Sequence, residues 1–331
     1  MTSDVLATAE AGAPVPASGA RQVWRRLRRR RAAAVAATGL ALLILLALAA
    51  PLLSALTGQD PDAYHDDLVD SARGGVPLGS WGGISGEHWL GVEPGTGRDL
   101  FIRLVYGARI SLLVAFGATV LQVLLGVGIG IAAGLGNRLV DSVLSHLSDV
   151  FLALPTLAFV IALTAVVPGD FPRPLLLILV IALFGWAGTA RIVRAQTLSL
   201  KKADFVAAAR LGGSGPLRVA RRELLPSLAA PVITYAAILL PSNIVAEAGL
   251  SFLGVGIRPP TPSWGQMLSS ATTWFRADAA YVLLPAGLLF LTVLAFTVLG
   301  DALRVALDPR EASRLGAGRR RPRKARKGDP A

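Results

Sequence analysis

The chain has 331 residues, of which 53% are hydrophobic, and its formal net charge is +12. Its mean hydropathy of +0.58 is above that of ordinary soluble domains and indicates a protein of the lipid bilayer. It contains no cysteine, which excludes disulfides, thiolate metal sites and thiol catalysis.

Six apolar windows are long enough to cross a membrane. A helix rises about 1.5 Å per residue, so about 20 apolar residues span the hydrocarbon core. None of the windows alternates polar and apolar residues as an outer-membrane strand does, so we expect an all-α membrane protein with six transmembrane helices. The first window is longer than a signal-peptide core and follows a tail, which favours an uncleaved helix. The windows are 32–56, 111–135, 150–167, 174–190, 228–252 and 281–299.

Positive charge is concentrated in three segments that an even number of spans places on one side. Residues 21–31, 191–222 and 304–327 together hold 25 of the 33 Lys and Arg residues, which predicts that both termini are cytoplasmic. The loop 57–106 has eight acidic residues against three arginines, so we expect it to be extracytoplasmic. The basic residues flank spans and lack interleaved aromatics, so they indicate anionic lipid and topology rather than nucleic acid.

These patterns divide the chain into successive parts. The ends are rich in small and basic residues and have too few large apolar groups to order themselves, so we expect disordered basic cytoplasmic tails. The parts are a tail over 1–31, a first transmembrane helix over 32–56, the acidic loop 57–106, a five-helix core over 107–305 with a cytoplasmic loop at 191–226, and a tail over 306–331.

Three glycines at fourfold spacing lie in the second window. Gly126, Gly130 and Gly134 leave one helix face without side chains. We expect another helix to pack closely against that face.

A basic segment between the fourth and fifth windows, "VAAARLGGSGPLRVARRELLP" at 206–226, predicts a helical hairpin. A first helix ends at Gly212-Gly213, where glycine can adopt the left-handed conformation. Pro216 suits the start of a second helix and Pro226 its end. Leu217, Ala220 and Leu224 share one face of it, with arginines beside them. Local physics leaves two functions open, an interfacial lipid anchor or a docking element for a cytoplasmic protein.

Several motifs make residues 88–309 resemble the inner-membrane permease subunits of ABC importers, in the dipeptide, oligopeptide and nickel group. The hairpin keeps that family's spacing at Ala208, Ala209, Gly213, Leu225 and Pro226, but has Ala207 where the family usually has glutamate. The other motifs are "HWLG" at 88–91, "GRDLFIRLVYGARISLLV" at 97–114, "RIVRAQTLSL" at 191–200, "EAGLSFLGVGIRPPTPSWGQML" at 247–268 and "LTVLAFTVLGDALRVALDPR" at 291–310.

The resemblance implies a type I ABC importer permease in the cytoplasmic membrane, with dipeptides or oligopeptides as substrates and nickel chelates or another small solute as the alternative. It implies a sister permease, two cytoplasmic ATP-binding subunits and an extracytoplasmic binding protein as partners. ATP and Mg belong to the partners, since this chain has no phosphate-binding loop, and we expect no catalytic residue, metal or cofactor in it. The coupling residues are Asp204, Ala208, Ala209, Arg210, Gly213, Arg218, Arg222, Leu225 and Pro226.

Two rival functions follow from single residues. An ion-coupled secondary transporter needs an ionisable group at membrane depth, and Glu247 in the fifth window is the candidate, as a pathway or a structural carboxylate. An intramembrane serine protease would use a G-x-S-G motif, which occurs at 83–86 and 212–215. Neither motif lies in a window and no histidine is placed to form a buried dyad, so the protease is disfavoured.

Overall fold

The computed structural model describes residues 30–79 and 81–307, so the predicted tails over 1–31 and 306–331 lie almost entirely outside the described residues. Helices dominate the described chain, which confirms the all-α prediction, and one two-residue antiparallel strand pair lies in the loop after the first span. The elements are α2 (Arg31–Leu48), α3 (Ala50–Thr57), β1 (Val69–Asp70), β2 (Val76–Pro77), α4 (Leu100–Leu135), α5 (Arg138–Ala153), α6 (Thr156–Val166), α7 (Arg173–Leu200), α8 (Asp204–Leu211), α9 (Pro216–Val219), α10 (Leu225–Phe252), α11 (Trp264–Ala271) and α12 (Ala279–Leu307).

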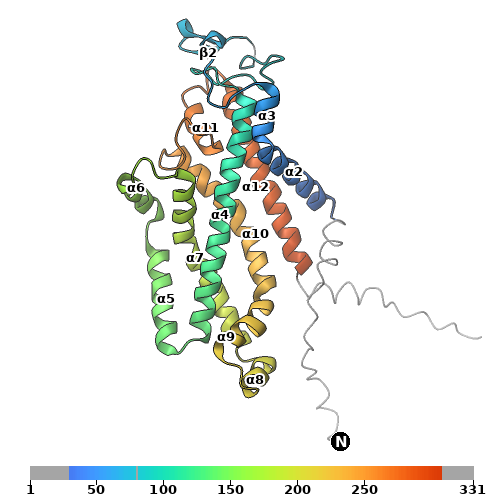
Figure 1. Cartoon of the computed structure of the whole chain (residues 1–331), viewed down its shortest axis with the longest axis vertical. Helices are drawn as coiled ribbons and strands as arrows, with labels where there is room; N and C mark the ends of the chain where they lie inside the picture. The colour runs from blue at the N-terminus through green and yellow to red at the C-terminus, as the bar shows by residue number, and fades with distance from the viewer. Residues whose placement is uncertain (1–29, 80, 308–331) are drawn as a thin grey trace, which may run out of the picture.

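The long helices form one upright bundle (Figure 1). Within the described residues five helices are long and apolar enough to cross a membrane, and α5 with α6 makes a sixth if this pair, bent by 85°, counts as one span. Figure 1 shows α4 and α7 both running down to the end where α8 lies, so α5 and α6 together return the chain across the bundle. We call residues 57–99, at the opposite end, the cap, and residues 204–226 the hairpin.

Helix ends differ from the hydropathy windows where polar residues continue a helix or proline interrupts one. The first window is divided at Ala49, because Pro51 lies in the first turn of α3 and cannot donate a hydrogen bond to the preceding turn. α4 begins at Leu100, so the last residues of the predicted loop 57–106 are helical. Asp99 starts this helix early, since its Oδ1 accepts a hydrogen bond from the Ile102 N–H at 2.8 Å.

The glycine face of α4 packs against α7, which confirms the expected close approach. A Cβ placed on Gly130 would lie 2.7 Å from the Val193 Cβ, and one on Gly134 would lie 2.5 Å from the Thr197 Cγ2. Real Cβ atoms do not come this close to other heavy atoms. The two helices therefore pack at a separation that only glycine permits.

Polar side chains join three helices deep in the bundle. Gln122 of α4 donates to the Ile181 carbonyl of α7 at 2.9 Å, and Asn243 of α10 donates to Gln122 at 2.9 Å and to Thr119 at 2.8 Å. All three side chains are buried. Because each amide has a partner, the network can hold α4, α7 and α10 in one arrangement at membrane depth.

A buried ionic cluster fixes the cap to the bundle. The Glu93 carboxylate lies 2.8 Å from the Nε of Arg98 and, through its other oxygen, 2.8 Å from the Nε of Arg103. Tyr281 at the start of α12 donates to Glu93 at 3.1 Å. Arg103 also donates to the Pro260 carbonyl at 3.2 Å, so the cluster joins the cap to α4, α12 and the segment before α11.

Candidate functional site

The hairpin lies at the end of the bundle farthest from the cap (Figure 1). α7 leads into it and continues to Leu200, well past the apolar window that ends at 190. The Lys201 ammonium then donates to the Gly134 carbonyl at the end of α4, at 3.1 Å. This contact places a positive charge at a helix C-terminus, where it is favourable, and fixes where the hairpin starts.

The elbow of the hairpin is the predicted left-handed glycine. Gly213 has φ +81°. Its N–H donates to the Arg210 carbonyl and the Ser214 N–H to the Ala209 carbonyl, each at 3.0 Å. These two bonds complete a Schellman motif, which satisfies carbonyls at the end of α8. The elbow is therefore a defined turn.

The second helix does not stop at Pro226, and that prediction was wrong. α9 continues through a π-helical turn, Ala220–Leu224, into α10 without a break. In an α-helix the ring of Pro226 would clash with the carbonyl of residue 222 and the missing N–H would leave that carbonyl unpaired. A π turn directly before the proline changes the register of the hydrogen bonds, so the helix passes the proline and enters the bundle.

The inner face of the hairpin packs into the bundle through apolar side chains. Val206, Val219 and Leu224 are buried and form one cluster with Val193 and Leu228. Leu217, which we expected on the same face as Leu224, is instead 68% exposed, because the π turn shifts the helical register. Burial of each such side chain contributes about 1.5–3 kcal/mol, so the hairpin is held firmly against α7 and α10.

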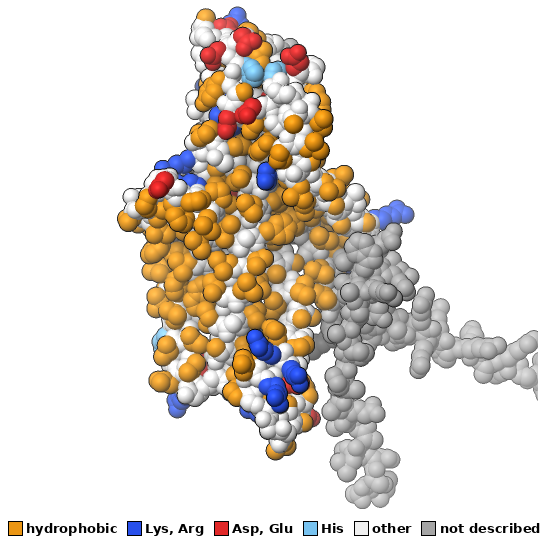
Figure 2. Space-filling model, viewed as in Figure 1, with side chains coloured by type: hydrophobic (Ala, Val, Ile, Leu, Met, Phe, Trp, Pro, Cys, Tyr) orange, Lys and Arg blue, Asp and Glu red, His pale blue; other side chains and the backbone are white. Residues whose placement is uncertain are grey.

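The outer face is an open basic groove of about 510 Å³. Leu211, at the end of α8, is 90% exposed beside it. Figure 2 shows basic side chains among hydrophobic ones at this end of the molecule. Within the described part of the chain no hydrogen bond or ion pair engages the side chains of the groove's arginines. The groove is lined by Gly213, Gly215, Pro216, Leu217, Arg218, Arg221 and Arg222.

The predicted coupling residues are distributed over the surface of the hairpin. Gly213, Arg218 and Arg222 line the groove, whereas Leu225 and Pro226 are exposed on the first turn of α10, outside it. The remaining coupling residues lie on α8, and all of them are exposed except Ala209, which is half-buried. They are Asp204, Ala208, Ala209 and Arg210. Sequence reasoning missed Leu211 and Arg221. Arg221 adjoins Arg222 and could have been included, but the exposure of a leucine depends on the turn around it.

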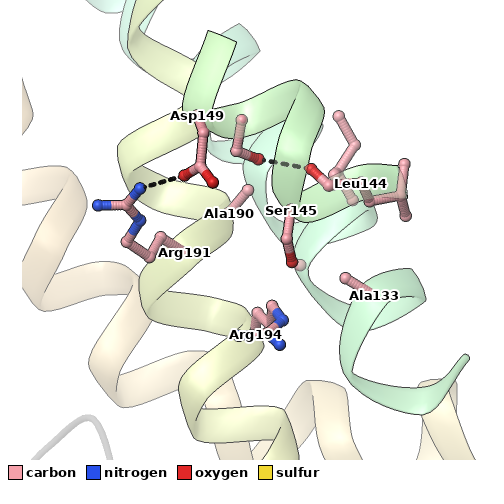
Figure 3. Close-up of a pocket in the computed structure, with 10 residues that line it drawn as sticks. Ala133, Leu144, Ser145, Asp149, Ala190, Arg191 and Arg194 are labelled. Atoms are coloured by element: carbon pink, nitrogen blue, oxygen red, sulfur yellow. Dashed lines mark hydrogen bonds and ion pairs between the residues drawn. The ribbon is translucent and has the colours of Figure 1, made fainter. Parts of the chain in front are cut away.

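Ion pairs connect the helix that enters the hairpin with α5. Arg194 of α7 donates to Asp141 at 2.8 Å, and Arg191 donates to Asp149 at 2.6 Å. Figure 3 shows Arg191 reaching Asp149, and both residues line a cavity of about 240 Å³ between α4, α5 and α7. Both arginines therefore lie on a spanning helix next to acidic partners. The Arg191 pair is more exposed than the Arg194 pair, so it contributes less.

Glu247 is fully buried near the cap end of α10. Ser251 donates to its Oε1 at 2.8 Å and in turn accepts the Ile257 N–H at 3.0 Å. Ser111 and Ser263 also lie against the carboxyl group. The residue thus joins α10 to α4 and to the segment that precedes α11, an environment that fits the structural interpretation of this carboxylate.

Comparison with known proteins gives the same class as the bundle and its hairpin. Residues 126–313 match the model of the binding-protein-dependent transport system inner membrane component, and residues 18–70 match the N-terminal transmembrane domain of oligopeptide transport permease C. Two inward-facing structures of the MetNI methionine ABC transporter have a similar fold. In one, the TM-score is 0.51 at 20% identity, over 62% of this chain and 96% of that one.

Curated relatives match along almost the whole chain. The dipeptide transport system permease protein DppC of Alkalihalophilus pseudofirmus is 33% identical over 93% of this chain and 97% of its own length. The oligopeptide transport system permease protein OppC of Salmonella typhimurium is 36% identical over 88% and 92%, and the glutathione transport system permease protein GsiD of Pectobacterium atrosepticum is 33% identical over 88% and 91%.

The fold is that of a type I ABC importer permease, a multi-pass membrane protein. The chain belongs to the family of binding-protein-dependent transport system inner membrane components.

Proposed function

We propose that this chain is the permease subunit of an importer for short peptides, and that its hairpin couples the bundle to ATP-binding subunits. The observation that carries the proposal is the basic groove, which is open on its outer face while the inner face of the hairpin is packed into α7 and α10. A partner that moves the hairpin therefore moves two spans with it. ATP and Mg belong to that partner.

The charge distribution supports a cytoplasmic location for the hairpin. The three segments that hold 25 of the 33 basic residues include it and both chain ends, and positively charged segments are retained in the cytoplasm. The cap then faces the other side of the membrane, where an extracytoplasmic binding protein delivers substrate. Short peptides are the substrate class, because the relatives named above are permeases for dipeptides, oligopeptides and glutathione.

A second face of the bundle fits a sister permease and the translocation pathway. α10 and α12 form a groove of about 560 Å³ whose lining includes Ser242, Thr297 and Asp301. Asp301, just beyond the apolar window that ends at 299, has no partner among the described residues, and the polar side chains in the lining of the groove suit protein or water better than lipid. We infer that this face lies against a second permease or water. A heterodimer with a sister permease provides a protein surface and a water-filled pathway beside this groove.

The test separates docking from lipid anchoring. In the double variant Arg218→Glu with Arg222→Glu, like charges now oppose the expected partner surface. We therefore expect weaker co-purification of the ATP-binding subunits, most clearly at low salt, where this repulsion is least screened, and reduced ATP-dependent peptide uptake in vesicles. The matched control is Arg138→Glu, an exposed arginine at the same end of the bundle, at the first position of α5. If the double variant retains its ATP-binding subunits at the level of the control, the arginines do not dock a partner.

A further inference from the structure

A carboxylate oxygen at the cap end has no partner. Asp278 precedes α12 and is only 6% exposed. Its Oδ1 accepts the Ala280 N–H at 3.0 Å and so caps the helix. Its Oδ2 is buried and has no hydrogen-bond partner among the described residues. The hydrogen bond to the Ala280 N–H accounts for Oδ1 of the carboxylate, whereas no interaction among the described residues accounts for Oδ2.

This carboxylate lies in the wall of a pocket of about 380 Å³ between α12 and the cap. Gly82 closes over it with φ +73°, and a Cβ there would be 2.9 Å from the Asp278 Oδ2. Trp81, the one non-glycine residue of the described chain with positive φ, stands at the pocket with 75% of its surface exposed. The other lining residues are Val76, Pro77, Gly79, Ala277, Ala279 and Ala280.

The chemistry of the pocket favours a singly charged cation as its ligand. A buried carboxylate is unfavourable without a positive partner, and the N-terminus of α12 offsets this only in part. A metal ion needs several ligands, and the described residues contain no group of three or more His, Cys, Asp or Glu side chains that could hold one. The nearby Arg276 lies over the Phe275 ring, at 5.5 Å, and makes no ion pair with Asp278.

The surroundings favour an amine. An indole attracts an ammonium group by its ring face, and the small apolar residues of the wall suit an alkyl chain. Exposed acidic side chains on the cap add a negative field, which Figure 2 shows at the upper end. They are Asp60, Asp62, Asp66, Asp67 and Glu87.

We propose that the pocket formed by Asp278, Trp81 and Gly82 is a binding site for a primary ammonium group. Two sources share this chemistry, the amino terminus of a short peptide and the lysine side chain of a protein that contacts the cap. This site is inferred from the pocket alone and does not depend on the proposed transport function. The site can therefore fail its test while the transport function holds, and the transport function can fail its test while the site holds.

The test measures binding by the full-length chain in lipid nanodiscs. The protein is labelled with fluorotryptophan, and the Trp81 resonance is assigned as the one that disappears in Trp81→Phe. Titration with n-butylammonium should shift this resonance in a saturable way, whereas the neutral analogue 1-butanol should not. Asp278→Asn keeps a side chain that can cap α12, and it should weaken binding about tenfold or more. Asp170→Asn, the same change at an exposed acid outside both the cap and the pocket, should leave binding unchanged.

Competition distinguishes the sources. Displacement by alanyl-alaninamide but not by its N-acetyl form identifies a peptide amino terminus, and displacement by Nα-acetyl-lysine amide alone identifies a protein lysine. Displacement by both supports a general ammonium site. No saturable shift, an equal response to 1-butanol, or unchanged binding in Asp278→Asn would overturn the proposal.

Discussion

Gly213 is required for its backbone conformation and for no other reason. A Cβ at this position would meet no atom within 4 Å, yet φ is +81°. Gly215, two residues later, is equally open and has an ordinary φ of −67°. The hairpin therefore contains both a glycine that sets the elbow and one that does not.

Gly213→Val should abolish uptake while membrane insertion survives. A β-branched residue at positive φ is strained by about 1–3 kcal/mol, so the elbow opens and the groove loses its shape. Uptake and membrane yield are measured in parallel with Gly215→Val, which adds the same bulk to the groove without straining the backbone and should lose less uptake than Gly213→Val. Equal loss in the two variants would show that bulk at the tip, and not the turn, causes the defect.

Glu247→Gln tests the buried carboxylate. The amide oxygen can still accept the Ser251 hydroxyl, so we expect normal assembly and a partial loss of uptake. Glu247→Leu leaves Ser251 without this acceptor and should cost about 1–3 kcal/mol of stability, seen as a lower thermal midpoint of the purified protein. Wild-type uptake by Glu247→Gln would exclude a functional role for the charge.

Helices are predictable from sequence where apolar character extends over a whole span, and less so at their ends. The windows at 228–252 and 281–299 lie within α10 and α12. The window at 150–167 missed the sharp bend between α5 and α6, since hydropathy does not report direction. In the hairpin, Gly212-Gly213 marked the elbow correctly. No local pattern showed the π turn before Pro226, which accompanies the burial of Val219 and Leu224 in the bundle.

The contact between α4 and α7 can be tested on one helix. Gly130→Leu forces a side chain into Val193 and should destabilise the bundle by about 1–3 kcal/mol or more. Gly128 lies on the same helix, and a Cβ there would meet nothing within 4 Å, so Gly128→Leu should be tolerated. Thermal midpoints of the two purified variants are compared. Equal midpoints would mean that the glycine face does not set the helix separation.

At the scale of the whole molecule the two ends carry opposite charge. Acidic side chains gather at the cap and basic ones at the hairpin, with a hydrophobic surface between them (Figure 2). This is the distribution expected of a protein that crosses a membrane in one orientation, with its basic end in the cytoplasm.

The orientation can be measured directly because the chain has no cysteine. A cysteine introduced by Asp66→Cys, in the cap, should react with an impermeant maleimide in whole cells, or in spheroplasts if an outer membrane is present. One introduced by Ser214→Cys, in the hairpin, should react only after permeabilisation. The parent chain gives the background. Labelling of Ser214→Cys in intact cells, with Asp66→Cys protected, would reverse the orientation.

The ionic cluster of the cap also sets an order on biogenesis. Glu93 and Tyr281 are separated by 188 residues along the chain, and Arg103 reaches the Pro260 carbonyl across 157. A ribosome must therefore deliver the chain past Tyr281 before Glu93 and Arg103 find all their partners, and until then Glu93 can pair only with nearby groups such as Arg98 and Arg103. We therefore expect the cap to close onto α12 and the segment before α11 late in synthesis, after the start of the last helix has been made.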